Sequence, residues 1–369
     1  MAITLAEVDA NCLRHNLQII RKKTNGAAVL AMVKADGYGH SMLKVAKVFR
    51  KEKVEYLGVA VIDEAIKLRK NGDIGKILVM VSPEPTDADL FIDHNIETAF
   101  SSFQILKAFA KRASERNTII TGHLYLDTGM HRDGIACEDA IEFMQYVQKN
   151  PQIKIIGLMT HLATADMPEV DFAKRQIELF EKTREKLASS GFVFNYYHAA
   201  NSSAILNYPQ SHYNLVRPGI SLYGYMPTEE MAIEMQLRPA MKWKSKVMLI
   251  KEVKRGGTVG YGLTYIADKD TKIAVVPIGY ADGLPRSLSN NFQCLIKNKR
   301  YNSVGSVCMD EFMIDIEDSD VKLCDEVVLL GSQGAEEILP YELATKVNSI
   351  PYEIISNVNG RVKKILVNE

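Results

Sequence analysis

Residues 28–40 read AVLAMVKADGYGH, and this stretch opens the series of segments that sets the fold. Six apolar residues run without interruption up to Lys34, which is typical of a strand covered on both faces in a parallel sheet. Gly37 and Gly39 follow and allow the backbone to turn tightly. The stretch therefore predicts a buried parallel strand that presents a lysine at its carboxyl end.

Seven further apolar, β-prone runs follow, at residues 56–60, 76–81, 97–100, 122–127, 155–160, 193–198 and 214–217. Segments of helical period separate them and begin at Ser or Asp residues suited to capping a helix; examples are residues 62–70, 101–114 and 170–190. Eight strand–helix units predict an α/β fold with a closed (β/α)8 TIM-type barrel. An open, doubly wound sheet is the alternative for this half of the chain.

The pattern changes beyond about residue 236. Helical periodicity disappears until residues 340–348, and Gly and Asn turns separate strand-like segments such as TKIAVVPIGYADG and DEVVLLG. A chain of 369 residues also exceeds the usual size of one hydrophobic core. We therefore expect residues 1–235 to form the barrel and residues 236–369 to form a mainly β domain.

The charges are balanced, because lysine plus arginine and aspartate plus glutamate number 45 each. The compact basic run at residues 297–300 lies where a hairpin turn is expected, so nothing favours nucleic acid or an anionic membrane as a partner. The N-terminus lacks a basic segment, and no apolar run approaches the roughly 18 residues of a spanning helix. We expect neither a secretory signal nor a membrane span.

The five cysteines are odd in number, widely scattered and without a Cys-x-x-Cys pair: Cys12, Cys137, Cys294, Cys308 and Cys324. This pattern fits neither a disulfide framework nor a structural zinc site. We expect reduced thiols in a cytoplasmic protein that has no metal site.

Reactive residue types follow several of the predicted strands. In (β/α)8 enzymes the chemistry lies at the carboxyl ends of the strands. The residues that follow them here are Lys34, Arg132, His161, Ser202 with Asn201, and Arg217. A single such lysine or histidine is more often a solvated or structural residue, but five on one rim predict a common site.

Lys34 emerges from a dry barrel interior, where desolvation disfavours the ammonium and lowers its pKa from about 10.4. A lysine of this kind is a nucleophile toward carbonyl groups and forms Schiff bases. The loop of Arg217, Pro218, Gly219 and Ile220 offers backbone N–H groups where such barrels commonly hold phosphate. Together these features predict pyridoxal 5'-phosphate as the cofactor.

Nine motifs occur in order along the chain: AVLAMVKADGYGH, DTGMHRDG, THLATAD, HAANSSA, RPGISLYG, VGYGLTY, GYADGLPR, VGSVCMDEFMID and PYE. They resemble the successive signatures of bacterial alanine racemase, a family of fold-type III pyridoxal-phosphate enzymes. The resemblance extends from about residue 1 to residue 362. It implies interconversion of L-alanine and D-alanine for peptidoglycan, in a homodimer with shared active sites.

The resemblance also implies roles for individual residues. Lys34 holds the cofactor and exchanges the proton on one face of the substrate α-carbon, while Tyr261 of the second subunit serves the other face. A chain of interactions runs from Tyr261 through His161 and Arg217 to the pyridine nitrogen, which Arg217 leaves unprotonated because arginine keeps its protons.

The remaining implied roles concern the phosphate, the substrate carboxylate and the entrance. Phosphate contacts come from Tyr38, Ser202, Gly219, Ile220 and Tyr352. Arg132 and the backbone of Met309 clamp the carboxylate, Asp310 positions that loop, and Tyr280 and Tyr352 narrow the entry channel.

Two positions depart from the family pattern. Tyr125 stands where many members carry a lysine that is often carbamylated, so a tyrosine hydroxyl, a bound anion or a neighbouring side chain must orient Arg132. Ser41 replaces the usual glycine after Gly39 and His40, where we expect a local adjustment of the first helix.

Other functions receive less support. Asp127, Thr128 and Gly129 form the aspartic-protease tripeptide, but it occurs only once, and no helical pattern follows the glycines at residues 257–262. A basic-amino-acid decarboxylase would carry a late Cys-Asp motif, which this sequence lacks. A broader-specificity racemase and a non-enzymatic pyridoxal-phosphate carrier stay open as alternatives, although a carrier has no need of the domain that bears Tyr261.

Overall fold

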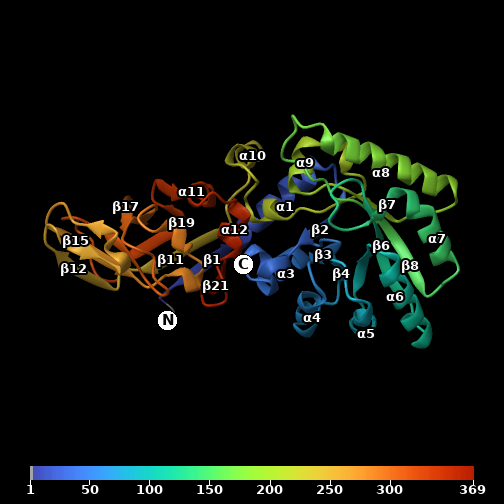
Figure 1. Cartoon of the computed structure of the whole chain (residues 1–369), viewed down its shortest axis with the longest axis horizontal. Coiled ribbons are helices and arrows are strands. Elements are labelled where there is room, and N and C mark those ends of the chain that lie inside the picture. Colours follow the sequence, from blue (N-terminus) through green and yellow to red (C-terminus); the bar gives the residue numbers. More distant parts are fainter. Residues whose placement is uncertain (1–2) are drawn as a thin grey trace. The chain divides into compact units, whose positions relative to one another are not determined.

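The computed structural model describes residues 3–369, which form two compact units (Figure 1). The barrel unit comprises residues 14–35 and 45–222, and the sheet unit comprises residues 3–13, 36–44 and 223–369.

The barrel unit contains the eight predicted strands, which run parallel in the order β10-β2-β3-β4-β5-β6-β8-β9. They are β2 (Ala28–Met32), β3 (Tyr56–Val59), β4 (Lys76–Val79), β5 (Glu97–Phe100), β6 (Ile120–Asp127), β8 (Ile153–Met159), β9 (Tyr196–His198) and β10 (Leu215–Val216). The short strand β7 (Ile135–Ala136) pairs with β6. Asn214 Oδ1 accepts from Tyr197 N at 2.8 Å, and Arg217 N donates to Ala200 O at 2.9 Å. These bonds join the two end strands, so the predicted barrel is confirmed.

Helices separate the strands of the barrel: α1 (Ala10–Lys23), α3 (Met42–Lys51), α4 (Ile62–Lys70), α5 (Ala88–His94), α6 (Phe103–Glu115), α7 (Ala140–Gln148), α8 (Phe172–Ser189) and α9 (Ser202–Asn207). Of the three helix caps expected from the sequence, one is confirmed. Ser102 Oγ accepts from Ile105 N and caps α6, whereas Val61 precedes α4 and Asp171 makes no side-chain cap bond to α8. Burial of apolar side chains, rather than capping, therefore fixes α4 and α8.

The sheet unit is built on a mainly antiparallel sheet of the order β12-β15-β18-β17-β16-β19-β11-β1-β21. Its strands are β1 (Leu5–Asp9), β11 (Met241–Lys246), β12 (Leu249–Val253), β15 (Thr271–Val276), β16 (Gln293–Ile296), β17 (Lys299–Val304), β18 (Phe312–Asp315), β19 (Glu326–Gln333), β20 (Glu336–Ile338) and β21 (Lys363–Val367). A small ribbon, β13 (Thr258–Val259) with β14 (Tyr265–Ile266), and the helices α10 (Glu229–Glu234), α11 (Pro340–Lys346) and α12 (Pro351–Ser356) complete it.

The division of the chain differs from the expected one at three places, because residues 3–13, 36–44 and 223–235 belong to the sheet unit. We expected residues 1–235 in the barrel, but β1 pairs antiparallel with β11 and parallel with β21 in the sheet unit. The physical reason is its alternating pattern, since Ala6 and Val8 are fully buried while their neighbours are partly exposed.

Several smaller expectations can be checked directly. Lys297 and Asn298 adopt φ values of 51° and 63° between β16 and β17, which confirms the hairpin turn in the basic run. All five cysteines are free thiols. Within residues 3–369, no helix combines the length and apolar character needed to cross a membrane.

Candidate active site

Lys34 lies directly after the apolar segment that contains β2, at the carboxyl end of that strand. Glu64 fixes the adjoining backbone, because its carboxylate oxygens accept from Ala35 N at 2.7 Å and from Ala60 N at 2.8 Å. Burial lowers the pKa of Lys34, the positive charge of Arg132 lowers it further, and Glu64 opposes the shift. The structure thus supports the predicted direction of the Lys34 pKa.

The segment after Lys34 is a left-handed turn, α2 (Lys34–Tyr38). Ala35, Asp36 and Tyr38 have φ values of 52°, and Gly37 has a φ of 68°. Left-handed conformation costs a non-glycine residue about 1–2 kcal/mol, so this turn concentrates backbone strain beside the lysine. Gly39 has a φ of 79°, and a Cβ atom there would lie 2.0 Å from Ile355 O, so glycine is required at this position.

Arg217 closes the barrel beside β10 and is buried. It donates to five acceptors, namely His198 Nδ1 (2.9 Å), His198 O (2.8 Å), Thr160 O (2.7 Å), Ala199 O (3.1 Å) and His161 Nδ1 (3.2 Å). Burial lowers the pKa of Arg217 to about 10, which leaves the guanidinium charged at neutral pH. Its position is therefore fixed by the carboxyl ends of two neighbouring strands, β8 and β9.

His161 follows β8 and accepts from Arg217 through Nδ1, so its neutral form carries the proton on Nε2. Burial and the positive charges of Arg217, Arg132 and Lys34 hold the pKa of His161 well below its usual range. The barrel unit therefore brings together four of the predicted rim residues, with a neutral imidazole among three cationic side chains.

The predicted phosphate loop converges on Ser202, at the start of α9. Ser202 Oγ accepts from Gly219 N at 2.9 Å, from Ser221 N at 3.3 Å and from the Ser221 hydroxyl at 3.0 Å. Ile220 is buried in the same loop. Backbone N–H groups and hydroxyls that point to one place form a cradle suited to an anion. Ser221 was missed in the sequence, although the run RPGIS places it directly after the predicted loop.

Arg132 lies in the loop after β6 and its side chain is exposed, with Nε 3.3 Å from Asp133 Oδ2. The buried Tyr125 on β6 lies close enough to Arg132 for the two side chains to interact electrostatically. Burial raises the pKa of Tyr125, and the neighbouring Arg217 and Arg132 oppose that shift. Of the three candidates for orienting Arg132, a neighbouring side chain, Asp133, makes the observed contact, and the Tyr125 hydroxyl lies near enough to act on it.

The sheet unit contains the other predicted residues, in two groups. Tyr38 and Tyr352 belong to a buried aromatic cluster, in which the Tyr38 ring stacks on Tyr223 at 5.0 Å and lies 6.4 Å from the Tyr352 ring. His40 lies 4.6 Å from Tyr223 in the same cluster.

The second group lies on adjacent loops of the sheet unit. Tyr280 N donates to Cys308 O at 3.0 Å, so Tyr280 lies beside Met309, and Ser306 Oγ donates to Tyr261 O at 2.8 Å. Asp310 accepts from Arg361 at 2.9 Å, and Arg361 Nε lies 3.3 Å from Asp282, which fixes the loop. These contacts tie the loop of Asp310 to Arg361 and, through it, to Asp282.

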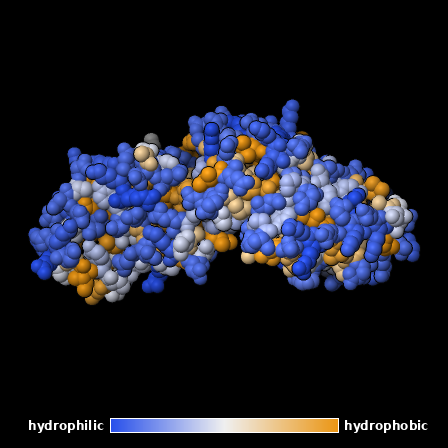
Figure 2. All heavy atoms as spheres, turned by 90° about the horizontal axis from the view of Figure 1, so that it is seen from above, coloured by the Kyte–Doolittle hydropathy of each residue, from blue (hydrophilic) through white to orange (hydrophobic). Residues whose placement is uncertain are grey.

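This second group is exposed. The Tyr261 side chain is 76% exposed and Met309 is 52% exposed. An apolar groove of about 420 Å³ adjoins Tyr261 and is lined by residues that include Val259, Ile273 and Met313. The face drawn in Figure 2 is mainly hydrophilic with separate hydrophobic areas. Exposed apolar side chains that adjoin a groove, as at Tyr261, indicate a binding surface.

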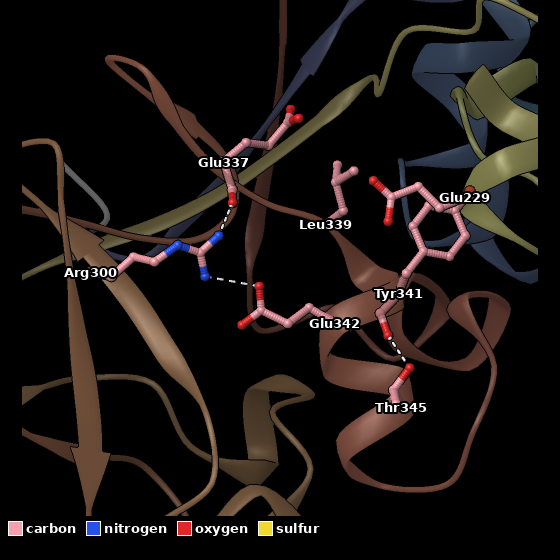
Figure 3. A pocket seen from close by; sticks show the side chains of 7 residues that line it. All are labelled: Glu229, Arg300, Glu337, Leu339, Tyr341, Glu342 and Thr345. Atoms are coloured by element: carbon pink, nitrogen blue, oxygen red, sulfur yellow. Dashed lines mark hydrogen bonds and ion pairs between the residues drawn. The ribbon is translucent and has the colours of Figure 1, made fainter.

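Another pocket of the sheet unit has a different character (Figure 3). Its Arg300 donates to Glu336 and Glu342 at 2.9 Å each, and Glu342 lies beside Tyr341 and Thr345 in the pocket wall. It contains none of the predicted site residues. Because its arginine is neutralised by its own carboxylates, we interpret this pocket as a structural ion-pair network.

Comparison with known proteins agrees with this geometry. The alanine racemase N-terminal domain model matches residues 8–227, and the C-terminal domain model matches residues 240–366. Alanine racemase from Carboxydothermus hydrogenoformans is 38% identical over 98% of this chain and 99% of its own length. That from Helicobacter pylori is 34% identical over 99% of each chain.

Solved structures give the same result. Alanine racemase from Streptomyces lavendulae has a TM-score of 0.95 at 29% identity, covering 100% of this chain and 98% of that one. Alanine racemase from Clostridium difficile has a TM-score of 0.94 at 34% identity, covering 100% and 97%. A histidine racemase from Leuconostoc mesenteroides has a TM-score of 0.91 at 29% identity, covering 99% and 98%. With both domain models matched across nearly its whole length, the chain belongs to the alanine racemase family of isomerases.

Proposed function

We propose that the chain interconverts L-alanine and D-alanine with pyridoxal 5'-phosphate as its cofactor. The observation that carries the proposal is the barrel rim, where the half-buried Lys34 is accompanied by Arg132, His161 and Arg217. Titratable side chains whose pKa values are shifted by burial and by one another, gathered on one rim, are typical of a functional site.

The residues of the rim fit the cofactor. Lys34 has the lowered pKa that an amine needs to attach to its aldehyde. The N–H groups of Gly219 and Ser221 and the hydroxyl of Ser202 would hold the phosphate, and Arg217 would face the pyridine nitrogen as a donor. When bound, the cofactor withdraws electrons from the substrate α-carbon and so makes its proton removable.

The chain's own residues then handle the proton. Racemisation needs a base on one face of the α-carbon and an acid on the other, with roles that exchange between directions. We assign Lys34 Nζ to one face and the Tyr261 hydroxyl to the other. The exposed Tyr261 would serve the site of a second subunit, so the active species would be a homodimer.

Arg132 would bind the substrate carboxylate, since a guanidinium matches a carboxylate with two parallel hydrogen bonds. The Met309 backbone and the loop held by Asp310 would complete this clamp, and Tyr38 and Tyr352 would add to the phosphate contacts. Tyr280 and Tyr352 would narrow the entrance, which favours a substrate with a small side chain.

We also propose that the product D-alanine supplies peptidoglycan and that the chain works in the cytoplasm. The five free cysteines support a reducing compartment.

The test is an assay of D-isomer formation from L-alanine, L-serine, L-lysine and L-arginine in the presence of the cofactor. We expect the highest kcat/KM for L-alanine. Preference for a long cationic substrate would support the broader-specificity alternative, which the structural similarity to a histidine racemase keeps open. Cofactor binding without any D-isomer would indicate a non-enzymatic carrier.

A second measurement locates the cofactor. Borohydride reduction followed by peptide mapping should label Lys34. Label on any other lysine would contradict the assignment.

A further inference from the structure

The interior of the barrel unit contains a line of buried polar side chains that the proposed mechanism does not use. Such interiors are normally filled by branched apolar side chains. Here His123 on β6 and His198 on β9 are completely buried and lie between Arg217 and Glu97.

The distances connect these four residues in sequence. Arg217 Nη1 lies 2.9 Å from His198 Nδ1, and His198 Nε2 lies 2.7 Å from His123 Nδ1. His123 Nε2 lies 3.3 Å from Glu97 Oε2. Within residues 3–369, those last two atoms are buried and form no hydrogen bond, so each has the other as its nearest polar contact across the 3.3 Å. Each imidazole nitrogen therefore faces a single neighbour.

The chemistry of the two ends fixes the protons between them. A guanidinium only donates and a carboxylate only accepts. Because Arg217 donates to His198 Nδ1, the neutral His198 carries its proton on Nε2 and donates it to His123 Nδ1. His123 in turn carries its proton on Nε2, which points to Glu97. One arrangement of protons thus satisfies the whole line, with both imidazoles neutral.

The buried charge of Arg217 needs a counter-charge, which a line of polar side chains leading to a carboxylate can provide. All five of its acceptors are uncharged, and within residues 3–369 no carboxylate lies within 4.0 Å of its guanidinium. A buried cation without a counter-charge costs several kcal/mol. His123 lies between the two charges, since Glu97 raises its pKa and Arg217 lowers it, while burial lowers it most.

The surrounding residues hold the line in place. A Cβ atom on Gly157 would lie 2.2 Å from His123 Nδ1, so glycine in β8 makes room for the ring. The Tyr196 ring stacks on His123 at 6.0 Å, and the Tyr56 ring meets it edge-on at 5.7 Å. Lys76 Nζ lies 3.2 Å from the Tyr196 hydroxyl.

The far end of the line lies at the opposite rim of the barrel. Tyr56, Lys76, Glu97 and Tyr196 are the first residues of β3, β4, β5 and β9, whereas Lys34 and Arg217 follow the last residues of their strands. Parallel strands bring their first residues to one rim and their last residues to the other. The line therefore crosses the barrel from the rim of Glu97 to the rim of the candidate site.

We propose that Glu97, His123 and His198 form a relay, with hydrogen bonds from Arg217 through His198 to His123 and a charge contact from His123 to Glu97, that supplies the counter-charge of Arg217 and fixes its guanidinium. They are positioning residues, because they act through Arg217. The relay itself rests on the distances above, and its effect on catalysis rests on the proposed function.

The test of the relay is the tautomer of each histidine, read from long-range ¹H–¹⁵N spectra of the full chain with ¹⁵N-labelled histidine. Near neutral pH, His123 and His198 should both be neutral with the proton on Nε2. A proton on Nδ1 of either ring, or a charged imidazole, would overturn the proposal. The groups that face the rings and influence them are Arg217, Glu97, Lys76, Tyr56 and Tyr196.

Variants of Glu97 test the connection. Glu97→Gln removes the charge, and the His198 signals should move although His198 does not touch Glu97; unmoved His198 signals would refute the relay. Glu97→Asp keeps the carboxylate and should restore at least part of the original spectrum. The matched control is Glu336→Gln, which removes a carboxylate from Arg300 in the sheet unit and should leave the signals of both histidines unchanged.

The catalytic consequence is measured separately. Glu97→Gln should lower kcat for alanine by about tenfold, as loss of an outer carboxylate does at other histidine-based sites, with little change in KM. An unchanged kcat would remove the link to catalysis. If the unmodified chain shows the expected tautomers but no racemase activity, the proposed function fails and the relay stands.

Discussion

The two groups of residues assigned to the active site differ sharply in their surroundings. In the barrel unit, Arg217 and Ser202 are 3% and 4% exposed and are held by several hydrogen bonds each. In the sheet unit, Tyr261 and Met309 are mostly exposed on loops. The comparison teaches that one chain carries a preorganised half of the proposed site and an exposed half, which is the arrangement expected if each site combines residues of two copies.

The largest effect should come from breaking the buried half. Arg217→Gln leaves several buried acceptors without donors, so we expect the free energy of unfolding to fall by about 3 kcal/mol. Tyr261→Phe removes only an exposed hydroxyl and should change it by less than about 0.5 kcal/mol. Urea denaturation of both variants checks the contrast, and equal losses of stability would contradict it.

Three histidines of the barrel unit make the stability of the chain depend on pH. Burial lowers the pKa values of His123, His161 and His198 in the folded chain, so below about pH 6.5 only the unfolded chain takes up their protons. Each should therefore lower the free energy of unfolding by about 1.4 kcal/mol for every pH unit below that point. Urea denaturation at a series of pH values measures the slope. His123→Gln should lower this slope by about 1.4 kcal/mol per pH unit, which corresponds to one proton fewer taken up on unfolding. An unaltered slope would show that His123 is not buried in its neutral form.

The smallest effect on stability should come from Tyr125, which lies beside the exposed Arg132. Tyr125→Phe removes a hydroxyl close to Arg132, and a hydrogen bond from the guanidinium to that hydroxyl in the substrate complex would contribute about 1.5–3 kcal/mol to substrate binding. We expect KM for alanine to rise about tenfold while the stability of the chain changes little. Added chloride or bicarbonate should not stimulate the unmodified chain, and stimulation would favour a bound anion as the partner of Arg132.

The sequence was sufficient for the barrel because each parallel strand is a continuous apolar run that needs no knowledge of its neighbours. The position of β1 was not predictable in this way. LAEVD followed by a helix resembles a first strand–helix unit, and its partners β11 and β21 lie more than 230 residues away. Pairing over such separations depends on which apolar face is left uncovered, and no local pattern records that.

The candidate site divides similarly. Residues directly after strands, such as Lys34 and Arg217, can be found by position alone. His123 lies inside β6, and its significance appears only when β9 and β5 bring His198 and Glu97 to its two nitrogens. Ser221 likewise gains its meaning from its bond to Ser202.

The most direct test of the central claim is to mix two inactive variants. Lys34→Ala removes the base of the buried half, and Tyr261→Phe removes the acid of the exposed half. If each site combines Lys34 of one subunit with Tyr261 of another, the mixed dimer contains one intact site, and alanine racemisation should return after the subunits exchange. Exchange that is verified by mass spectrometry but restores no activity would contradict a site shared between two chains.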